Sequence, residues 1–369
     1  MRFPVTEPQT DVRIFGAASR YVQGPGALDL IGTELARVGK SCLVLIDVFL
    51  FDRLQPRIAE ACSAAGVATA CRPVSSEVTE AGIAAAADGV PADIDVVVGV
   101  GGGKTIDIAK GVSRMLGVAV VTVPTIASND SPASRAIALY NDDHQLREVP
   151  LLARNPALVL VDTAVIAQAP ARFLAAGIGD ALSKHFEVEA CRAAGGHTMQ
   201  GTRGLRVASV LAAGCYRILR EESAAALASH VVGRIDQAFE DTVEAVILLS
   251  GLAFENGGLS IAHAATRGLM AVPGAASKLH GEHVAYGLLM QLALTGASND
   301  EIMDVEGFLA SIGLPRSLRD LGAAPSEEVV GAVANGTLTA PHVRNVAGVQ
   351  VDHAALVAAI LRVERLVAV

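Results

Sequence analysis

Three residues beyond Thr163 have side chains that commonly bind metal ions, namely Asp180, His263 and His280. Asp180 lies in a segment, 177–182, where its alternative role is to cap a helix. His263 lies in an apolar segment, 259–265, where an imidazole is costly to bury unless something binds it. One carboxylate and two imidazoles that leave a position open suit a catalytic divalent cation such as zinc or iron(II). Because the three residues belong to separate segments, their spacing leaves both interpretations open.

A glycine cluster, Gly101–Gly103, indicates a phosphate-binding turn. It follows a β-branched, apolar run at 96–100 and precedes Lys104, Thr105 and a segment with helical spacing. A strand, a tight glycine turn and a helix N-terminus together present free backbone N–H groups to a phosphate. The cluster fits neither a P-loop, which requires glycine at Val98, nor the dinucleotide fingerprint, whose third glycine would stand at Lys104. We expect a pyrophosphate-binding turn; the alternative is a turn that uses glycine for close packing of strand and helix.

Two polar features follow other predicted strands. Asp47 ends an apolar run at 42–46, where a dinucleotide-binding domain places the acidic residue that binds the adenosine ribose. The alternative for Asp47 is a solvated loop carboxylate. The loop 124–134 is rich in Ser, Thr, Asn and Asp side chains and follows the apolar run 118–123. Because ligands of open α/β sheets bind beyond the carboxyl ends of the strands, we favour a ligand-binding loop over a plain turn.

Composition narrows the class of protein and its partners. The chain has 369 residues, which favours two domains, and its net charge of −9 argues against a nucleic-acid partner. Five scattered cysteines without a C-x-x-C pair are typical of free thiols in a reducing compartment. We find no apolar signal core near the N-terminus and no uninterrupted apolar span, so we expect a cytoplasmic protein with no membrane partner.

Hydrophobic periodicity predicts the elements that position these residues. Continuous apolar runs that alternate with helical segments predict a parallel sheet covered on both sides, in a doubly wound, Rossmann-like α/β domain at residues 1–163. Beyond Thr163, helical spacing predicts an all-α domain at residues 164–369, with the active site in the cleft between the domains. We expect strands at 42–46, 67–71, 94–98, 118–123 and 157–161, and a turn at 21–27. We expect the longest helices at 174–194, 204–219, 235–254, 283–294 and 354–366.

Taken together, these segments resemble the glycerol dehydrogenases, within the iron-containing (group III) alcohol dehydrogenase superfamily. The resemblance implies a dehydroquinate synthase-like architecture, with NAD bound in the N-terminal domain and a metal ion in the helical one. It also implies a homo-oligomer, commonly an octamer in this family. The resemblance covers 21–27, Asp47, 101–107, 124–130, Ser134, Tyr140, 177–182, 262–264 and 279–287, in matching order and spacing.

The resemblance also assigns roles to single residues. Asp180, His263 and His280 would hold zinc, with iron(II) or another divalent metal as the alternative. The same three residues, together with Asp130, would form the catalytic and polyol-binding site. The residues implied in NAD binding are Asp47, Gly101, Gly102, Gly103, Lys104, Asp107, Thr125, Ser128, Ser134, Ala136 and Tyr140. The expected reaction is the reversible oxidation of glycerol to dihydroxyacetone with NAD as hydride acceptor.

The chain departs from the family pattern near the metal ligands. Thr266 and Arg267 stand where a His and an Asn are usual, Asn129 where Thr is usual, and Ala136 where Leu is usual. Because Arg267 could attract an anion, the alternatives are a related dehydrogenase of another polyol, a diol, a 2-hydroxy acid or glycerol 1-phosphate. A sugar-phosphate cyclase or lyase would need more basic residues near the ligands. An NTPase would need the glycine that is absent at Val98.

Overall fold

The computed structural model describes residues 12–141 and 145–368, so the N-terminal segment in which we expect no signal sequence lies largely outside the described residues. The contacts of the chain divide it into two compact units. The sheet unit comprises Ala17–Leu174 and Ala228–Leu248, and the helical unit comprises the remaining described residues, mainly 175–227 and 249–368.

The sheet unit contains a six-stranded parallel sheet in the order β1-β8-β5-β4-β2-β3. All five predicted strands are present. The predicted turn at 21–27 is wrong in its first half, because Tyr21–Gly24 forms strand β1, paired in parallel with β8. The strands are β1 (Tyr21–Gly24), β2 (Ser41–Asp47), β3 (Ala68–Val74), β4 (Val96–Gly101), β5 (Ala119–Pro124) and β8 (Leu158–Asp162), with a separate hairpin of β6 (Leu139–Tyr140) and β7 (Leu146–Glu148).

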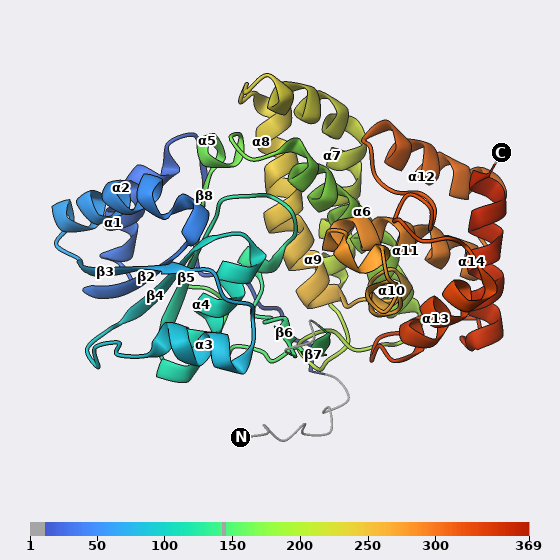
Figure 1. Cartoon of the computed structure of the whole chain (residues 1–369), viewed down its shortest axis with the longest axis horizontal. Coiled ribbons are helices and arrows are strands. Elements are labelled where there is room, and N and C mark those ends of the chain that lie inside the picture. The colour runs from blue at the N-terminus through green and yellow to red at the C-terminus, as the bar shows by residue number, and fades with distance from the viewer. Residues whose placement is uncertain (1–11, 142–144, 369) are drawn as a thin grey trace. The chain divides into compact units, whose positions relative to one another are not determined.

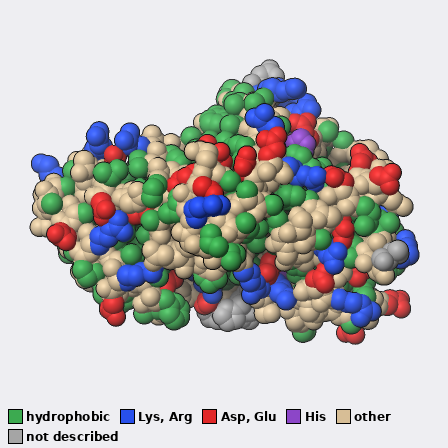
Figure 2. Space-filling model, turned by 90° about the horizontal axis from the view of Figure 1, so that it is seen from above, with side chains coloured by type: hydrophobic (Ala, Val, Ile, Leu, Met, Phe, Trp, Pro, Cys, Tyr) green, Lys and Arg blue, Asp and Glu red, His purple; other side chains and the backbone are tan. Residues whose placement is uncertain are grey.

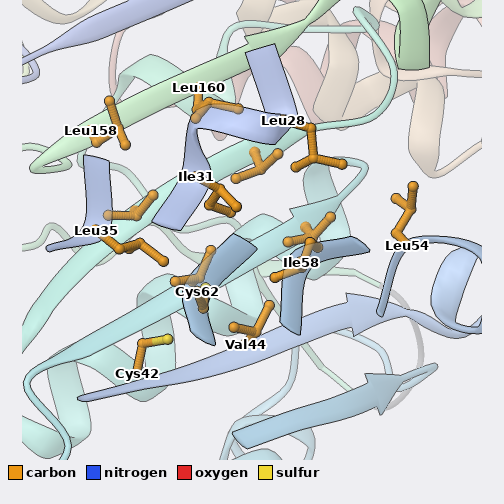
Figure 3. Close-up of a cluster of buried hydrophobic side chains, with 14 of the residues drawn as sticks. Leu28, Ile31, Leu35, Cys42, Val44, Leu54, Ile58, Cys62, Leu158 and Leu160 are labelled. Atoms are coloured by element: carbon orange, nitrogen blue, oxygen red, sulfur yellow. The ribbon is translucent and has the colours of Figure 1, made fainter. Parts of the chain in front are cut away.

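Alternate residues of the central strands pack into two different hydrophobic cores. Val44 and Val98 contact one cluster, which includes Leu28, Ile31 and Ile58 from the helices above the sheet in Figure 1 and is shown closely in Figure 3. Leu43, Leu45 and Val97 contact a second cluster on the opposite face, with Ile83, Ile108 and Val112 from α3 and α4. Because both faces are covered, the interiors of the central strands β2 and β4 are apolar, and the predicted doubly wound arrangement is confirmed. The helices of this unit include α1 (Ile31–Leu35), α2 (Phe51–Ala64), α3 (Glu80–Ala87), α4 (Gly103–Leu116), α5 (Thr163–Ile166) and α8 (Gln237–Glu244).

The sheet unit contains two segments, 164–174 and 228–248, that the expected domain ranges 1–163 and 164–369 assign to the other domain. Residues 228–248, which include α8, return to the sheet. Glu240 on α8 accepts hydrogen bonds from Gln23 Nε2 at 2.7 Å and from Thr163 Oγ1 at 2.6 Å. His230 Nε2 lies 2.6 Å from the carbonyl oxygen of Ala169. These polar contacts join the segment 228–248 to other parts of the sheet unit.

The helical unit is built from α-helices, as predicted. In it α10 packs against α11 and α13, and α11 packs against α14 (Figure 1). Helix α11 begins at His280 rather than at residue 283, and α8 continues through a π-helical turn, Ala245–Leu249, into α9. The helices are α6 (Ala171–Ala193), α7 (Arg206–Val231), α9 (Ser250–Gly257), α10 (Ile261–Met270), α11 (His280–Leu294), α12 (Asn299–Ser311), α13 (Glu327–Leu338) and α14 (His353–Val367), of which α6 and α7 reach into the sheet unit.

The surface and the helix lengths bear on possible partners. Basic side chains are scattered among acidic ones on the face that Figure 2 shows. Among the described residues, no single helix is both long and apolar enough to cross a membrane. One bent pair, Gln237–Gly257 with Ile261–Met270, meets the length and composition criteria jointly, with a bend of 100° between its halves.

Candidate functional site

The three predicted metal ligands come together in the helical unit. Asp180 lies on α6, His263 lies in the first turn of α10, and His280 is the first residue of α11. Asp180 Oδ1 lies 3.0 Å from His263 Nε2 and 3.8 Å from His280 Nε2. One ligand atom from each residue lies within 4.8 Å of the other two. Asp180 therefore sits in the middle of a helix and does not act as a helix cap.

Glycines beside the ligands allow the three helices to approach closely. A Cβ atom on Gly281 would lie 1.8 Å from the carbonyl oxygen of Ala176, so α6 and α11 touch through backbone atoms next to His280. A Cβ atom on Gly287 would lie 2.3 Å from the carbonyl oxygen of Ala262, so α10 and α11 touch next to His263. These two backbone contacts set the separation of the ligands.

Replacing Gly281 by alanine is expected to destabilise the protein by about 3 kcal/mol, because overpacking against a backbone carbonyl cannot be relieved by a side-chain rotation. The helices must separate, so the candidate ligand atoms move apart and affinity for a divalent metal ion should fall as well. Urea denaturation and zinc titration measure the two effects. Gly307→Ala is the matched control, because Gly307 lies on the exposed side of α12 with open space around its Cα, and alanine should be neutral or slightly stabilising there. Equal stability of the two variants would contradict the packing argument.

Glu187 orients His263. Its Oε2 atom lies 2.5 Å from His263 Nδ1, and its Oε1 atom accepts the backbone N–H groups of Ser260 and His263 at 2.8 and 3.0 Å. A carboxylate can only accept a hydrogen bond, so Nδ1 carries the proton and Nε2 faces Asp180. Burial opposes charge on both groups, but their mutual attraction outweighs it, lowering the pKa of Glu187 to about 2 and raising the pKa of His263 to about 9.

Lys184 also lies at this cluster. Its side chain is fully buried, and Nζ lies 2.7 Å from Asp180 Oδ1 and 3.3 Å from His263 Nε2. Burial would raise the pKa of Asp180, but the charge of Lys184 and the hydrogen bond from His263 outweigh it and lower that pKa. Asp180, Lys184 and Glu187 follow one another at spacings of four and three residues, which places them on one face of α6. That spacing is the signal by which the sequence could have revealed Lys184 and Glu187.

The residues present fit a divalent metal ion. A carboxylate oxygen and two imidazole nitrogens are ligands that zinc uses in catalytic sites. Ligand atoms around a tetrahedral zinc are about 3.4 Å apart, which is close to the 3.0 and 3.8 Å distances from Asp180 Oδ1. The His280 side chain is 46% exposed, so one side of the cluster remains accessible to another ligand.

The predicted dinucleotide residues gather at the carboxyl ends of neighbouring strands in the sheet unit. Asp47 ends β2, the glycine cluster ends β4, and the loop 125–138 follows β5. The chain crosses from one side of β2 to the other before forming β4, so Asp47 and Gly101 flank the topological switch point of the sheet. A Cβ atom on Gly101 would lie 3.1 Å from Asp47 Cβ, and α4 begins directly afterwards without a side-chain cap. The geometry predicted for a pyrophosphate-binding turn is therefore present.

The other predicted dinucleotide residues fall into several environments. Thr125, Ser134 and Asp107 are buried. Ser128, Ala136 and Tyr140 are half-buried, and Lys104 Nζ lies 2.5 Å from Glu77 Oε1 with its side chain 67% exposed. Asp130, the fourth predicted catalytic residue, is buried in the loop after β5, in the sheet unit.

Asp107 has its carboxylate engaged within the sheet unit. Its Oδ1 atom accepts from Ser131 Oγ at 2.7 Å and from Lys110 Nζ at 3.1 Å, and its Oδ2 atom accepts from the backbone N–H of Ala138 at 2.9 Å. Lys110 also donates to the carbonyl oxygens of Ser131 and Ala136, each at 2.7 Å. Asp107 and Lys110 therefore attach the loop after β5 to α4.

Comparisons with known proteins agree with this architecture. Residues 22–170 match the family described as iron-containing alcohol dehydrogenase. The chain is 41% identical over 303 residues to a glycerol dehydrogenase of Thermotoga maritima, covering 82% of this chain and 83% of the relative. It is 38% identical over 315 residues to a glycerol dehydrogenase of Escherichia coli, covering 84% of each chain. The crystal structure of glycerol dehydrogenase from Schizosaccharomyces pombe, 32% identical, superposes with a TM-score of 0.93 over 98% of this chain and 92% of that one. The chain therefore belongs to the glycerol dehydrogenase family within the iron-containing alcohol dehydrogenases, a group of alcohol oxidoreductases.

Proposed function

We propose that this protein oxidises glycerol reversibly to dihydroxyacetone, with NAD as the hydride acceptor and zinc held by Asp180, His263 and His280. The observation that carries the proposal is the convergence of one carboxylate and two imidazoles from three helices on one point. The relatives named glycerol dehydrogenase support the substrate and the reaction.

A zinc ion in this site would stabilise the alkoxide that forms from the substrate hydroxyl before hydride leaves. Asp180 supplies the negative charge of the site. Glu187 holds His263 with Nε2 directed at the shared point, so the imidazole does not need to reorient when a metal ion binds. The open side of His280 leaves space for the two neighbouring hydroxyls of the polyol. Asp130 is the carboxylate that we assign to hydrogen bonding with the polyol.

The dinucleotide is assigned to the carboxyl edge of the sheet. Asp47 would accept hydrogen bonds from the adenosine ribose, and the free N–H groups at the start of α4 would bind the pyrophosphate. The loop after β5, with Thr125, Ser128, Ser134 and Ala136, would line the rest of the cofactor, together with Tyr140. In this proposal residues 1–163 form the dinucleotide-binding domain and residues 164–369 the metal- and substrate-binding domain. The segments 164–174 and 228–248 belong to the same compact unit as the sheet.

Metal removal tests the proposal directly. We expect glycerol-dependent formation of NADH to be lost after chelator treatment and restored by zinc, while NADH still binds to the chelated protein. NADH absorbance follows the reaction, NADH fluorescence follows binding, and elemental analysis confirms that the metal has left. Full activity in protein shown to be free of metal would contradict the metal assignment. Recovery of activity with iron(II) but not with zinc would change the assigned metal to iron and would leave the proposed reaction unchanged.

Arg267 favours a second candidate, a dehydrogenase of a 2-hydroxy acid or another anionic alcohol. Its guanidinium lies on α10, and Nη1 donates to the carbonyl oxygen of Thr339 at 3.3 Å. The neighbouring Thr266 hydroxyl donates to the carbonyl oxygen of His263 at 2.7 Å, so it is engaged within its own helix. Arg267 is therefore the departure from the family pattern with the greater capacity to alter substrate choice. Comparing kcat/KM for glycerol, 1,2-propanediol and lactate separates the two candidates.

The homo-oligomer implied by the resemblance and the cytoplasmic location expected from the sequence composition stay predictions.

A further inference from the structure

The ammonium group of Lys184 contacts two of the atoms that would coordinate a metal ion. Its ammonium group donates to Asp180 Oδ1 at 2.7 Å and to the Asp180 carbonyl oxygen at 3.1 Å. It also lies 3.3 Å from His263 Nε2. Two of the three proposed ligand atoms are thus already in contact with a cation.

The opposite charges of Asp180 and Lys184 stabilise this arrangement in the absence of a metal ion. Asp180 and Lys184 are both almost completely buried, with side-chain exposures of 1% and 0%. A buried carboxylate without a partner is strongly unfavourable, and an adjacent ammonium group removes that penalty. A divalent cation that enters the site must take over Asp180 Oδ1 and His263 Nε2 and tolerate a positive charge within a few ångströms.

We propose that Lys184 is a resident counter-ion of the metal site, which holds the Asp180 carboxylate in the metal-free protein and competes with the metal ion for its ligand atoms. The inference rests on the proposed metal site and adds a residue that sets its affinity. It predicts a folded metal-free protein and a metal that exchanges more readily than the three ligands alone would allow.

Replacing Lys184 by methionine tests the competition, because methionine fills a similar volume and carries no charge. Zinc affinity is measured by competition with a chromophoric chelator on the full-length protein. We expect Lys184→Met to bind zinc about tenfold more tightly or more, since a unit charge next to the ligands is removed. Zinc should also raise the melting temperature of this variant more than that of the wild-type protein.

Two further variants separate competition from general effects. Lys184→Gln keeps a hydrogen-bond donor for Asp180 without the charge, and it should also bind zinc more tightly. Lys278→Met removes the same unit charge from a residue two positions before His280, and we expect a much smaller change in affinity. If both Lys184 variants fail to fold, a crystal structure of the zinc-bound wild-type protein decides. It should show Nζ beyond hydrogen-bonding distance from Asp180 Oδ1.

The outcomes distinguish this inference from the proposed function. A wild-type protein that binds no zinc and no other divalent metal would overturn the metal site itself. A wild-type protein that binds zinc, with unchanged or weaker affinity in both Lys184 variants, would overturn the counter-ion role and leave the metal site standing. A zinc-bound structure in which Nζ keeps its contact with Oδ1 would overturn it as well.

Discussion

Asp180→Ala is expected to abolish glycerol oxidation and leave NADH binding nearly unchanged. Asp180 is the only carboxylate of the proposed ligand set, and its Oδ1 atom is the one that both imidazoles approach. Two histidines on separate helices retain little affinity for zinc, and Lys184 would lose the anion that balances its charge. We expect kcat/KM to fall by about 10³-fold or more, because the stabilisation of the developing alkoxide is lost.

The measurement combines steady-state kinetics, zinc content and titration of NADH fluorescence. NADH binding should survive because the proposed dinucleotide residues belong to the sheet unit and Asp180 belongs to the helical unit. Glu189→Ala is the matched control, since Glu189 lies on the same helix with a 38% exposed side chain that pairs with Arg192. The control should keep both its zinc and its kcat. Full turnover in Asp180→Ala would overturn the metal assignment.

Much of the fold could be predicted because parallel strands are buried on both faces. Val44 and Leu43 pack into opposite cores, so both must be apolar and the run 42–46 is continuous in the sequence. Strand β1 was missed because Tyr21–Gly24 is short, contains Gln23 and is only half-buried along its length. Helix α8 belongs to the sheet unit, and Glu240 on this helix forms hydrogen bonds to residues far away in the chain. The local sequence pattern of α8 carries no information about such long-range contacts.

The site was less accessible to sequence reasoning. Asp180, His263 and His280 lie on three helices, so their spacing carried little information, and the resemblance to a family identified them as a set. The structure adds the contacts that position the three residues relative to one another. Gly281 and Gly287 permit the close approach of the helices, and Glu187 fixes the orientation of one imidazole. These residues determine how far apart the helices lie and how the ligands are oriented. The spacing of residues within one helix gives no information about such contacts between helices.

Lys110→Met is expected to lower the free energy of unfolding by about 3–5 kcal/mol, the range found when one partner of a buried ion pair is removed. Lys110 is fully buried and donates to Asp107 and to the carbonyl oxygens of Ser131 and Ala136. Methionine can replace its volume but none of these hydrogen bonds. The variant leaves a buried carboxylate with fewer donors and two carbonyl groups without this partner.

The same substitution should weaken NADH binding, because Lys110 attaches the loop after β5 to α4 and this loop contains most of the proposed cofactor residues. Urea denaturation measures the free energy of unfolding. NADH fluorescence, recorded in the absence of urea, measures cofactor binding. Lys40→Met removes a lysine with an exposed side chain from the same unit and should change stability by less than about 0.5 kcal/mol. Loss of stability with unchanged NADH affinity would show that the network supports the fold without shaping the cofactor site. Unchanged stability would contradict the role of Lys110 altogether.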